Sequence, residues 1–216
     1  MKKEIKYSLA KYGLFSNLDL LRQLLQIITW LRHGSRGIAP SPIKRMVLAS
    51  YLKDYGIQHF VETGTHHGDT LAYIAHDTSI HAVSIELDHA CYRAAVRRFA
   101  TWNNVTLLHG DSGALMPKVV DSMTAPALFW LDGHYSGDST AKGEKNTPVS
   151  AELQAILRSA VAGHVILIDD VRCFDGTLDY PHLDELLATI RADGRYAVEV
   201  SGDIIRLTPK IVDMST

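Results

Sequence analysis

Residues 62–70 read ETGTHHGDT, and they follow the short apolar run of residues 59–61. Gly64 permits a tight turn, while Gly68 permits a helix to begin close to a ligand with its free N–H groups directed at it. The stretch predicts a strand over residues 59–62, a glycine-containing turn and a helix over residues 70–76. Because the glycines are not spaced as Gly-x-Gly-x-x-Gly, the case for a pyrophosphate ligand is weakened.

The alternation of strand and helix continues beyond this stretch. Apolar runs predict strands over residues 81–85, 105–108, 127–131 and 165–168, with helices over 88–99, 112–120, 150–160 and 183–192. Residues 196–200 and 204–207 flank Ser-Gly-Asp, which is a hairpin signal. Continuously apolar runs such as LFWL (128–131) and VILI (165–168) indicate parallel strands covered on both faces. We therefore predict an α/β fold: a Rossmann-like, seven-stranded, mostly parallel sheet with a C-terminal antiparallel hairpin and helices on both faces.

Before the sheet, the pattern predicts a helical extension. Residues 18–32 carry apolar side chains at helical spacing, residues 34–42 are rich in Gly, Pro and Ser, and a second helix is expected over 41–54. Ser41 is the expected N-cap of that helix and Pro42 its first residue. Residues 1–58 carry ten Lys/Arg and three Asp/Glu, so their net charge is +7 and that of the remainder is −9. A basic extension therefore precedes an acidic body.

Composition restricts the class of protein. The 216 residues are 46% hydrophobic and 21% charged, which is ordinary globular usage. Cys91 and Cys173 match no disulfide or metal spacing, which favours a reducing compartment and a cytoplasmic location. The most apolar stretch, residues 14–31, includes Asp19 and Arg22, so a membrane span is not expected.

An acid lies at or just after the end of each predicted parallel strand: Glu62, Glu86, Asp111, Asp132 and the pair Asp169–Asp170. In an open α/β sheet, ligands bind outside the carboxyl ends of the strands. An acid after the second strand can accept both hydroxyls of a ribose, and Asp111 could accept an adenine amino group. Asp after a strand is also common turn chemistry, but acids in register at all five strand ends favour a ligand site.

The order of ETGTHHGDT, Glu86, GDS (110–112), LDGHY (131–135) and LIDDV (167–171) resembles class I S-adenosylmethionine-dependent methyltransferases. Within them it is most similar to bacterial small-molecule O-methyltransferases related to the macrocin O-methyltransferases and cephalosporin hydroxylase-like proteins. The resemblance covers about residues 56–208. It implies an S-adenosylmethionine-binding domain over residues 56–216, preceded by the extension of residues 1–55.

The resemblance also implies roles for individual residues. Glu62, Gly64 and Gly68 would surround the methionine part of the cofactor, and Thr65 and Thr70 of the same turn are further cofactor-binding candidates. Glu86 would bind the ribose hydroxyls, Asp111 and Ser112 would lie beside the adenine, and Asp132 would also border the cofactor. In related magnesium-dependent members, acids that match Asp132, Asp169 and Asp170 hold the ion. The turn residues His66 and His67 depart from the family's usual closely spaced glycines, and they are either near substrate or simply exposed.

Methyl transfer to a hydroxyl requires that the acceptor be aligned and deprotonated. His134, two residues beyond Asp132, is a candidate general base, with Asp132 as the second catalytic candidate. Alternatively, Mg²⁺ on Asp132, Asp169 and Asp170 would bind the acceptor oxygens and acidify the hydroxyl. Three clustered carboxylates would repel one another without a cation, which favours the metal. Asp170 could instead be a helix or turn cap, and Asp169 could hydrogen-bond the neighbouring loop.

The predicted function is O-methylation of a small hydroxylated acceptor, such as a sugar or glycan precursor or a secondary metabolite. A non-catalytic protein that has kept the fold and a nicotinamide-dependent oxidoreductase are the alternatives. The polar segment 136–147 is expected to form a loop or lid over the acceptor. We expect the basic extension to cover the cofactor cleft or pair with a second subunit, with peripheral contact to anionic lipid at the inner membrane as another possibility. Nucleic acid is disfavoured because the acidic face would repel phosphates.

Overall fold

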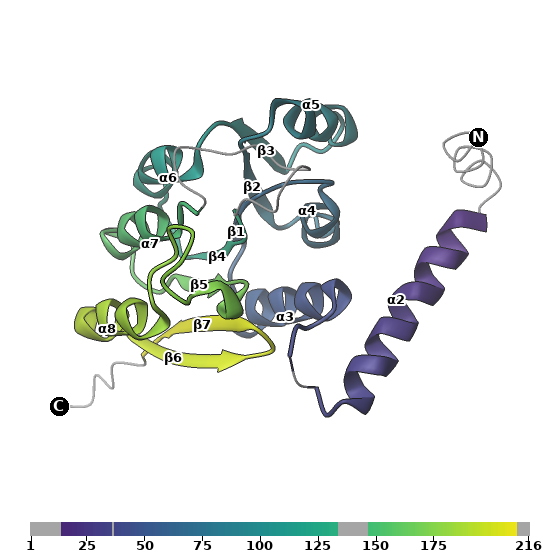
Figure 1. The fold of residues 1–216 in the computed structure, drawn as a ribbon. Coiled ribbons are helices and arrows are strands. Elements are labelled where there is room, and N and C mark those ends of the chain that lie inside the picture. The colour runs from purple at the N-terminus through teal and green to yellow at the C-terminus, as the bar shows by residue number, and fades with distance from the viewer. Residues whose placement is uncertain (1–13, 36, 134–146, 211–216) are drawn as a thin grey trace.

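The computed structural model describes residues 14–35, 37–133 and 147–210 of the chain. Two helices, α2 (Leu14–Arg32) and α3 (Ser41–Asp54), precede a region in which strands and helices alternate (Figure 1). In chain order this region contains β1 (His59–Thr63), α4 (Asp69–Ala75), β2 (His81–Glu86), α5 (His89–Arg98), β3 (Val105–His109), α6 (Ser112–Asp121), β4 (Ala127–Leu131), α7 (Val149–Leu157), β5 (Val165–Ile168), the short 3₁₀ helix η1 (Val171–Cys173), α8 (Leu183–Asp193), β6 (Tyr196–Ser201) and β7 (Ile204–Pro209).

The strands form one seven-stranded sheet in the order β3-β2-β1-β4-β5-β7-β6. Strands β1 to β5 are parallel, whereas β7 runs antiparallel to β5 and β6 antiparallel to β7. The predicted Rossmann-like architecture with its closing hairpin is therefore confirmed. Because β1 pairs with β2 on one side and β4 on the other, the strand order reverses between β1 and β4, where ligands bind in such sheets.

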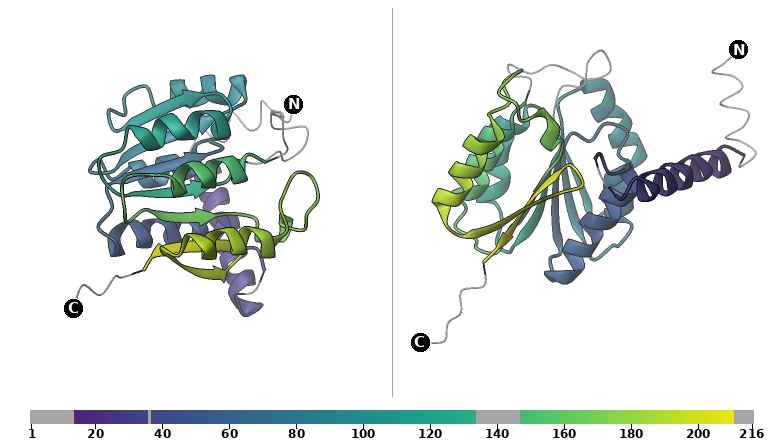
Figure 2. Two further views of the ribbon diagram at one scale, coloured as in Figure 1. Left: turned by 90° about the vertical axis from the view of Figure 1, so that its left-hand side faces the viewer. Right: turned by 60° about the horizontal axis from the view of Figure 1, so that its bottom comes forward.

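Helices cover both faces of the sheet (Figure 2). Successive strand residues enter opposite cores, so Phe60 and Leu128 pack with the core of α3, α4 and α5, while Val61 and Phe129 pack with that of α6, α7 and α8. All residues of β4 and β5 are buried, which explains their continuously apolar sequences.

Helix α3 packs into the first of these cores through Leu48 and Leu52, which are 1% and 6% exposed. Its start differs from the prediction: Pro40, not Ser41, is the N-cap, and no side chain caps the helix. The reason is that Pro40 has extended backbone angles while its carbonyl already accepts the N–H groups of Ile43 and Lys44. The domain boundary after residue 55 stays a prediction.

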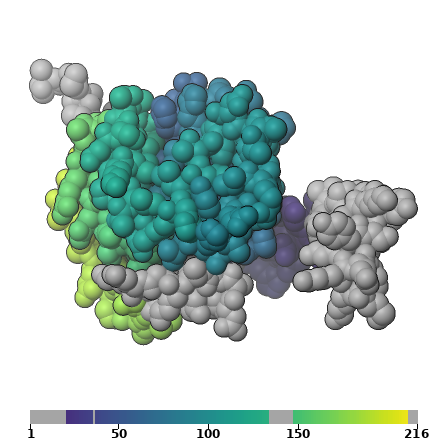
Figure 3. Space-filling view, turned by 90° about the horizontal axis from the view of Figure 1, so that it is seen from above, coloured from purple at the N-terminus to yellow at the C-terminus, as the bar shows by residue number. Residues whose placement is uncertain are grey.

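Helix α2 projects from the side of the body (Figures 1 and 3). Five of its described apolar side chains are between 43% and 55% exposed: Leu21, Leu24, Leu25, Ile28 and Leu31. Within the described residues, no helix is long and apolar enough to cross a membrane. Pairing or lipid contact through this helix stays a prediction.

Candidate functional site

A cavity of about 320 Å³ opens at the carboxyl ends of β1 and β4, where the strand order reverses. The turn between β1 and α4 forms one wall, β4 contributes Trp130 and Asp132, and the two N-terminal helices close another side. From the predicted cofactor set, this cavity is lined by Glu62, Gly64, Thr65, Gly68, Thr70 and Asp132; its other lining residues are Gln23, Gln26, Ser41, Pro42, Arg45, His66, His67, Asp69 and Trp130. Residues of the basic extension thus border the same cavity as the ETGTHHGDT turn.

Two glycines of the turn have positive φ angles and close neighbours. Gly64 has φ +82°, and a Cβ there would lie 2.6 Å from the carbonyl oxygen of Asp132. Gly68 is the N-cap of α4 with φ +75°, and a Cβ would lie 2.8 Å from the ring of Phe99. Both positions therefore require glycine, so that β1 can approach β4 and α4 can begin at the cavity.

Glu62 is buried on this cavity within a polar network. The Ser84 hydroxyl donates to Glu62 Oε1 at 2.7 Å, and the Thr65 hydroxyl lies 2.5 Å from that of Ser84. Burial raises the pKa of Glu62 from 4.5 to about 8, a shift that the Ser84 hydrogen bond opposes and the charges of Asp132 and Glu86 increase. A cationic ligand would stabilise the ionised carboxylate, so the cavity favours a positively charged group.

Glu86 does not line the cavity but lies beside it, and its hydrogen bonds hold the turn that forms one wall. Its carboxylate accepts the backbone N–H of His66 at 2.7 Å and that of Asp88 at 2.8 Å. A carboxylate has about four lone-pair positions, so these two bonds leave acceptor capacity for a ligand. The positive φ of His66 (+47°) belongs to the turn that Glu86 holds.

Asp111 and Ser112 also lie outside the cavity, at the start of α6. Asp111 is the N-cap of α6 and accepts the backbone N–H of Ala114 at 3.0 Å. Asp111 therefore acts as a turn and cap residue, which is the alternative that the sequence analysis gives for an Asp after a strand. A contact between Asp111 and adenine stays a prediction. Ser112 is buried and hydrogen-bonds the side chain of Glu152.

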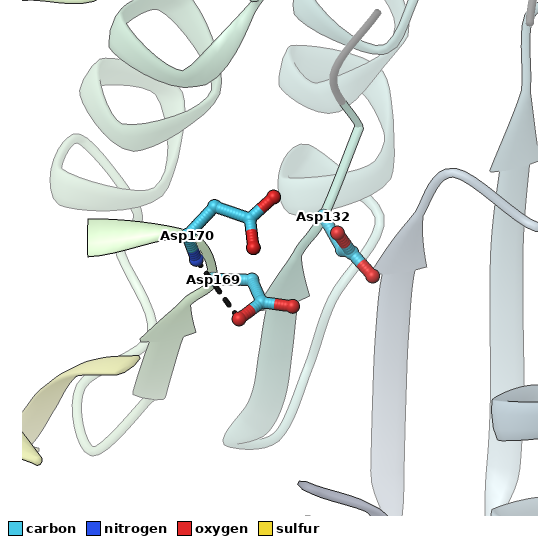
Figure 4. Close-up of side chains that lie close together, drawn as sticks. All are labelled: Asp132, Asp169 and Asp170. Carbon is cyan, nitrogen blue, oxygen red and sulfur yellow. Dashed lines mark hydrogen bonds between the residues drawn. The ribbon is translucent and has the colours of Figure 1, made fainter. Parts of the chain in front are cut away.

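The structure brings together Asp132 from the end of β4 and Asp169 and Asp170 from the end of β5 (Figure 4). One oxygen of each carboxylate lies within 4.8 Å of the others. Asp170 has a left-handed backbone (φ +60°), which costs a residue with a side chain about 1–2 kcal/mol. Its backbone N–H donates to Asp169 Oδ1 at 2.8 Å, so the two acids orient each other.

Two cationic side chains enter this acidic cluster. Lys44 Nζ lies 2.6 Å from Asp169 Oδ1, 2.5 Å from Asp169 Oδ2 and 3.8 Å from Asp170 Oδ1. Arg172 contacts Asp170 Oδ1 at 2.7 Å and also pairs with Asp203. Burial and the charge of Asp132 raise the pKa of Asp169, while the ammonium group of Lys44 opposes that rise.

One feature of the acidic cluster favours the predicted Mg²⁺ site, and another opposes it. Carboxylate oxygens at this spacing are suitable ligands for a hard divalent ion. However, both oxygens of Asp169 contact Lys44 and an oxygen of Asp170 contacts Arg172. In this arrangement the residues do not fit a resident ion, because Lys44 would have to leave Asp169 first.

Sequence reasoning missed Lys44 and Glu152. Glu152 of α7 is 1% exposed, and its Oε1 has no hydrogen-bond partner among the described residues. Burial raises its pKa to about 7, against the hydrogen bonds from Ser112 and Thr63. It borders a cavity of about 10 Å³ together with Asp132 and Asp169, which is room for about one water molecule. A lone acid in a helix carries no sequence signal for this position.

Two predictions lie outside the described residues. They are the general base His134 and the loop of residues 136–147, apart from Thr147. Both stay predictions.

No family model and no curated protein matches the chain. Among solved structures, the chain is similar to the O-methyltransferase from Bacillus cereus in complex with SAH, with 16% identity, a TM-score of 0.59 and coverage of 88% of this chain and 91% of that one. It is also similar to the O-methyltransferase TomG from Streptomyces achromogenes, involved in tomaymycin synthesis and in complex with SAM, with 17% identity, a TM-score of 0.54 and coverage of 87% and 89%. A third is the SAH-bound Podospora anserina methyltransferase PaMTH1, with 17% identity, a TM-score of 0.57 and coverage of 86% and 87%. At these identities, the likeness shows a shared fold.

Proposed function

We propose, from the premise that this chain has the fold of class I S-adenosylmethionine-dependent methyltransferases, that it methylates a hydroxyl group of a small acceptor. The observation that carries the proposal is the cavity of about 320 Å³ at the strand-order reversal, with the buried Glu62 and the half-buried Asp132 in its lining. One fold supports many activities, and it is the side chains of this cavity that favour methyl transfer.

The charge of the cavity suits a sulfonium cofactor. Glu62 and Asp132 present carboxyl groups to a space that two glycines keep open to the backbone. A sulfonium near Glu62 would favour its ionised form, because an opposite charge lowers the pKa of a buried carboxyl. When bound, the cofactor would supply an electrophilic methyl group on a good leaving group.

The remaining parts of the cofactor have candidate partners nearby. Glu86 retains lone pairs for the ribose hydroxyls after its two backbone hydrogen bonds. Asp111 and Ser112 begin α6 next to β3, where we place the adenine. This assignment follows the order of the strands across the sheet.

Asp132 connects the cofactor to the acceptor. It lines both the large cavity and the small one that borders Asp169 and Glu152. We place the acceptor hydroxyl beside Asp132, which orients it as a hydrogen-bond acceptor, with His134 as the base that takes its proton. A hydroxyl-rich acceptor, such as a sugar or a secondary metabolite, suits an acidic cluster because carboxylates accept hydrogen bonds from hydroxyls.

The first test is calorimetric titration of S-adenosylhomocysteine into the wild type, Glu86→Ala and the control Glu185→Ala. Glu185 is an exposed acid on α8. We expect binding by the wild type and the control and none by Glu86→Ala. Failure of the wild type to bind would refute the cofactor assignment, and binding of NADH instead would favour the oxidoreductase alternative.

A second test addresses catalysis. Turnover with a panel of hydroxylated acceptors is expected, and binding of the cofactor without turnover of any acceptor would favour the non-catalytic alternative. Activity that is lost in EDTA and restored by Mg²⁺ would support assistance by an ion at Asp132, Asp169 and Asp170. Activity that survives EDTA would leave His134 as the preferred base.

A further inference from the structure

Lys44 lies on the buried side of α3. It precedes Leu48 by four residues and Leu52 by eight, and residues at this spacing share one side of a helix. Leu48 and Leu52 are 1% and 6% exposed in the core against the sheet, and the side chain of Lys44 is 14% exposed. The packing that buries the two leucines therefore directs Lys44 toward the end of β5.

The contacts of Lys44 are those of a cation held by a carboxylate pair. An ammonium group has three N–H donors, and Nζ contacts both oxygens of Asp169 at 2.6 and 2.5 Å. Asp170 Oδ1 lies 3.8 Å from the same nitrogen. Asp169 and Asp170 are 6% and 4% exposed, so solvent screens these charges little.

We infer that the ammonium group of Lys44 is the resident cation of the acidic cluster, in the place that the sequence suggests for a divalent ion. Arg172 contributes the second positive charge through Asp170. The repulsion among the three carboxylates, which argued for a metal, is thus reduced by side chains of the protein itself.

Lys44 is a positioning residue, since it holds Asp169 beside Asp132. It also connects the basic extension to the site: the ion pair joins residues 125 positions apart in the chain. One consequence, that methyl transfer needs no added divalent ion, rests on the proposed function. The expected ion binding by the purified protein is independent of the proposed function.

The test is calorimetric titration of MgCl₂ and MnCl₂ into EDTA-treated and dialysed full-length protein. The variants are Lys44→Met, which keeps an unbranched apolar stem, and the control Lys53→Met, an exposed lysine on the same helix. We expect no saturable binding at millimolar ion for the wild type and Lys53→Met. Lys44→Met should bind one ion at least tenfold more tightly, and adding Asp169→Asn should abolish that gain.

Thermal unfolding gives a second readout, since an ion that binds only the folded state raises its melting temperature. Mg²⁺ should raise the melting temperature of Lys44→Met and leave that of the wild type unchanged. If Lys44→Met does not fold, ion binding is compared between the wild type and Asp169→Asn. Absence of ion binding in both proteins supports the inference. Ion binding by the wild type that Asp169→Asn removes overturns it.

Wild-type binding that Lys44→Met fails to strengthen would also overturn the inference. So would methyl transfer that stops in EDTA and resumes with Mg²⁺, although the proposed function would then stand. Conversely, the absence of cofactor binding would overturn the proposed function while the ion titrations still decided the role of Lys44.

Discussion

Replacement of Gly64 by alanine tests whether the close approach of the turn to β4 builds the site. The added Cβ would lie 2.6 Å from the carbonyl oxygen of Asp132 and 3.3 Å from Cα of Gly133, both of them backbone atoms. Because β1 and β4 are paired through Thr63 and Leu131, neither strand can withdraw freely. The substitution must therefore displace Asp132, a residue that we place beside both cofactor and acceptor.

The loss of stability expected for Gly64→Ala has two parts. A left-handed backbone costs alanine about 1–2 kcal/mol, and overpacking adds about 1–3 kcal/mol, which gives about 2–5 kcal/mol in all. For a protein of this size, each kcal/mol lowers the melting temperature by about 2–4 °C. Gly194→Ala is the matched control, because Gly194 has φ +78° but a Cβ there would have no described atom within 4 Å. Gly194→Ala should lose only the stability that the left-handed backbone costs.

The assay is thermal unfolding of Gly64→Ala, Gly194→Ala and the wild type, followed by calorimetric titration with S-adenosylhomocysteine. We expect Gly64→Ala to be the less stable variant and to bind at least tenfold more weakly, while Gly194→Ala binds like the wild type. Equal loss of stability in the two variants, with unchanged affinity in Gly64→Ala, would refute the steric argument.

Two further predictions concern Glu62 and the packing of α3. The pKa of Glu62 is about 8 in the folded protein and near 4.5 in the unfolded chain, so between these values the folded state binds one more proton. The free energy of unfolding should therefore fall as pH rises from 5 to 8. Glu62→Gln should reduce this slope in urea denaturation at pH 5, 6, 7 and 8; an unchanged slope would contradict the role of Glu62. Leu48→Ala should destabilise the protein by about 2–5 kcal/mol in urea unfolding, whereas Met46→Ala, at a 57% exposed position, should change stability by about 0.5 kcal/mol or less. Similar losses in these two variants would show that α3 does not anchor the core as described.

Local sequence carried most of the information about the fold. The runs LFWL and VILI predict strands buried on both faces, because a strand between two helical layers has no solvent-facing side. The glycine turn and the acids after the strands are equally local, since parallel strands bring their carboxyl ends to one edge of a sheet. The N-cap of α3 lies one residue before the predicted Ser41, because serine is the commoner cap and the extended backbone of Pro40 leaves no sequence signal.

By itself, the sequence determined the seven-stranded sheet, the glycine turn and the candidate acids of the site, all of which depend on side-chain periodicity and on residues close together in the chain. Only the tertiary structure decided which cation meets the acids. Lys44 reaches Asp169 because burial of Leu48 and Leu52 sets the rotation of α3 against the sheet. Glu152 likewise meets Ser112 and Thr63 only after α7 packs beside α6. Such contacts between distant residues depend on how helices dock, and docking is a property of the whole core.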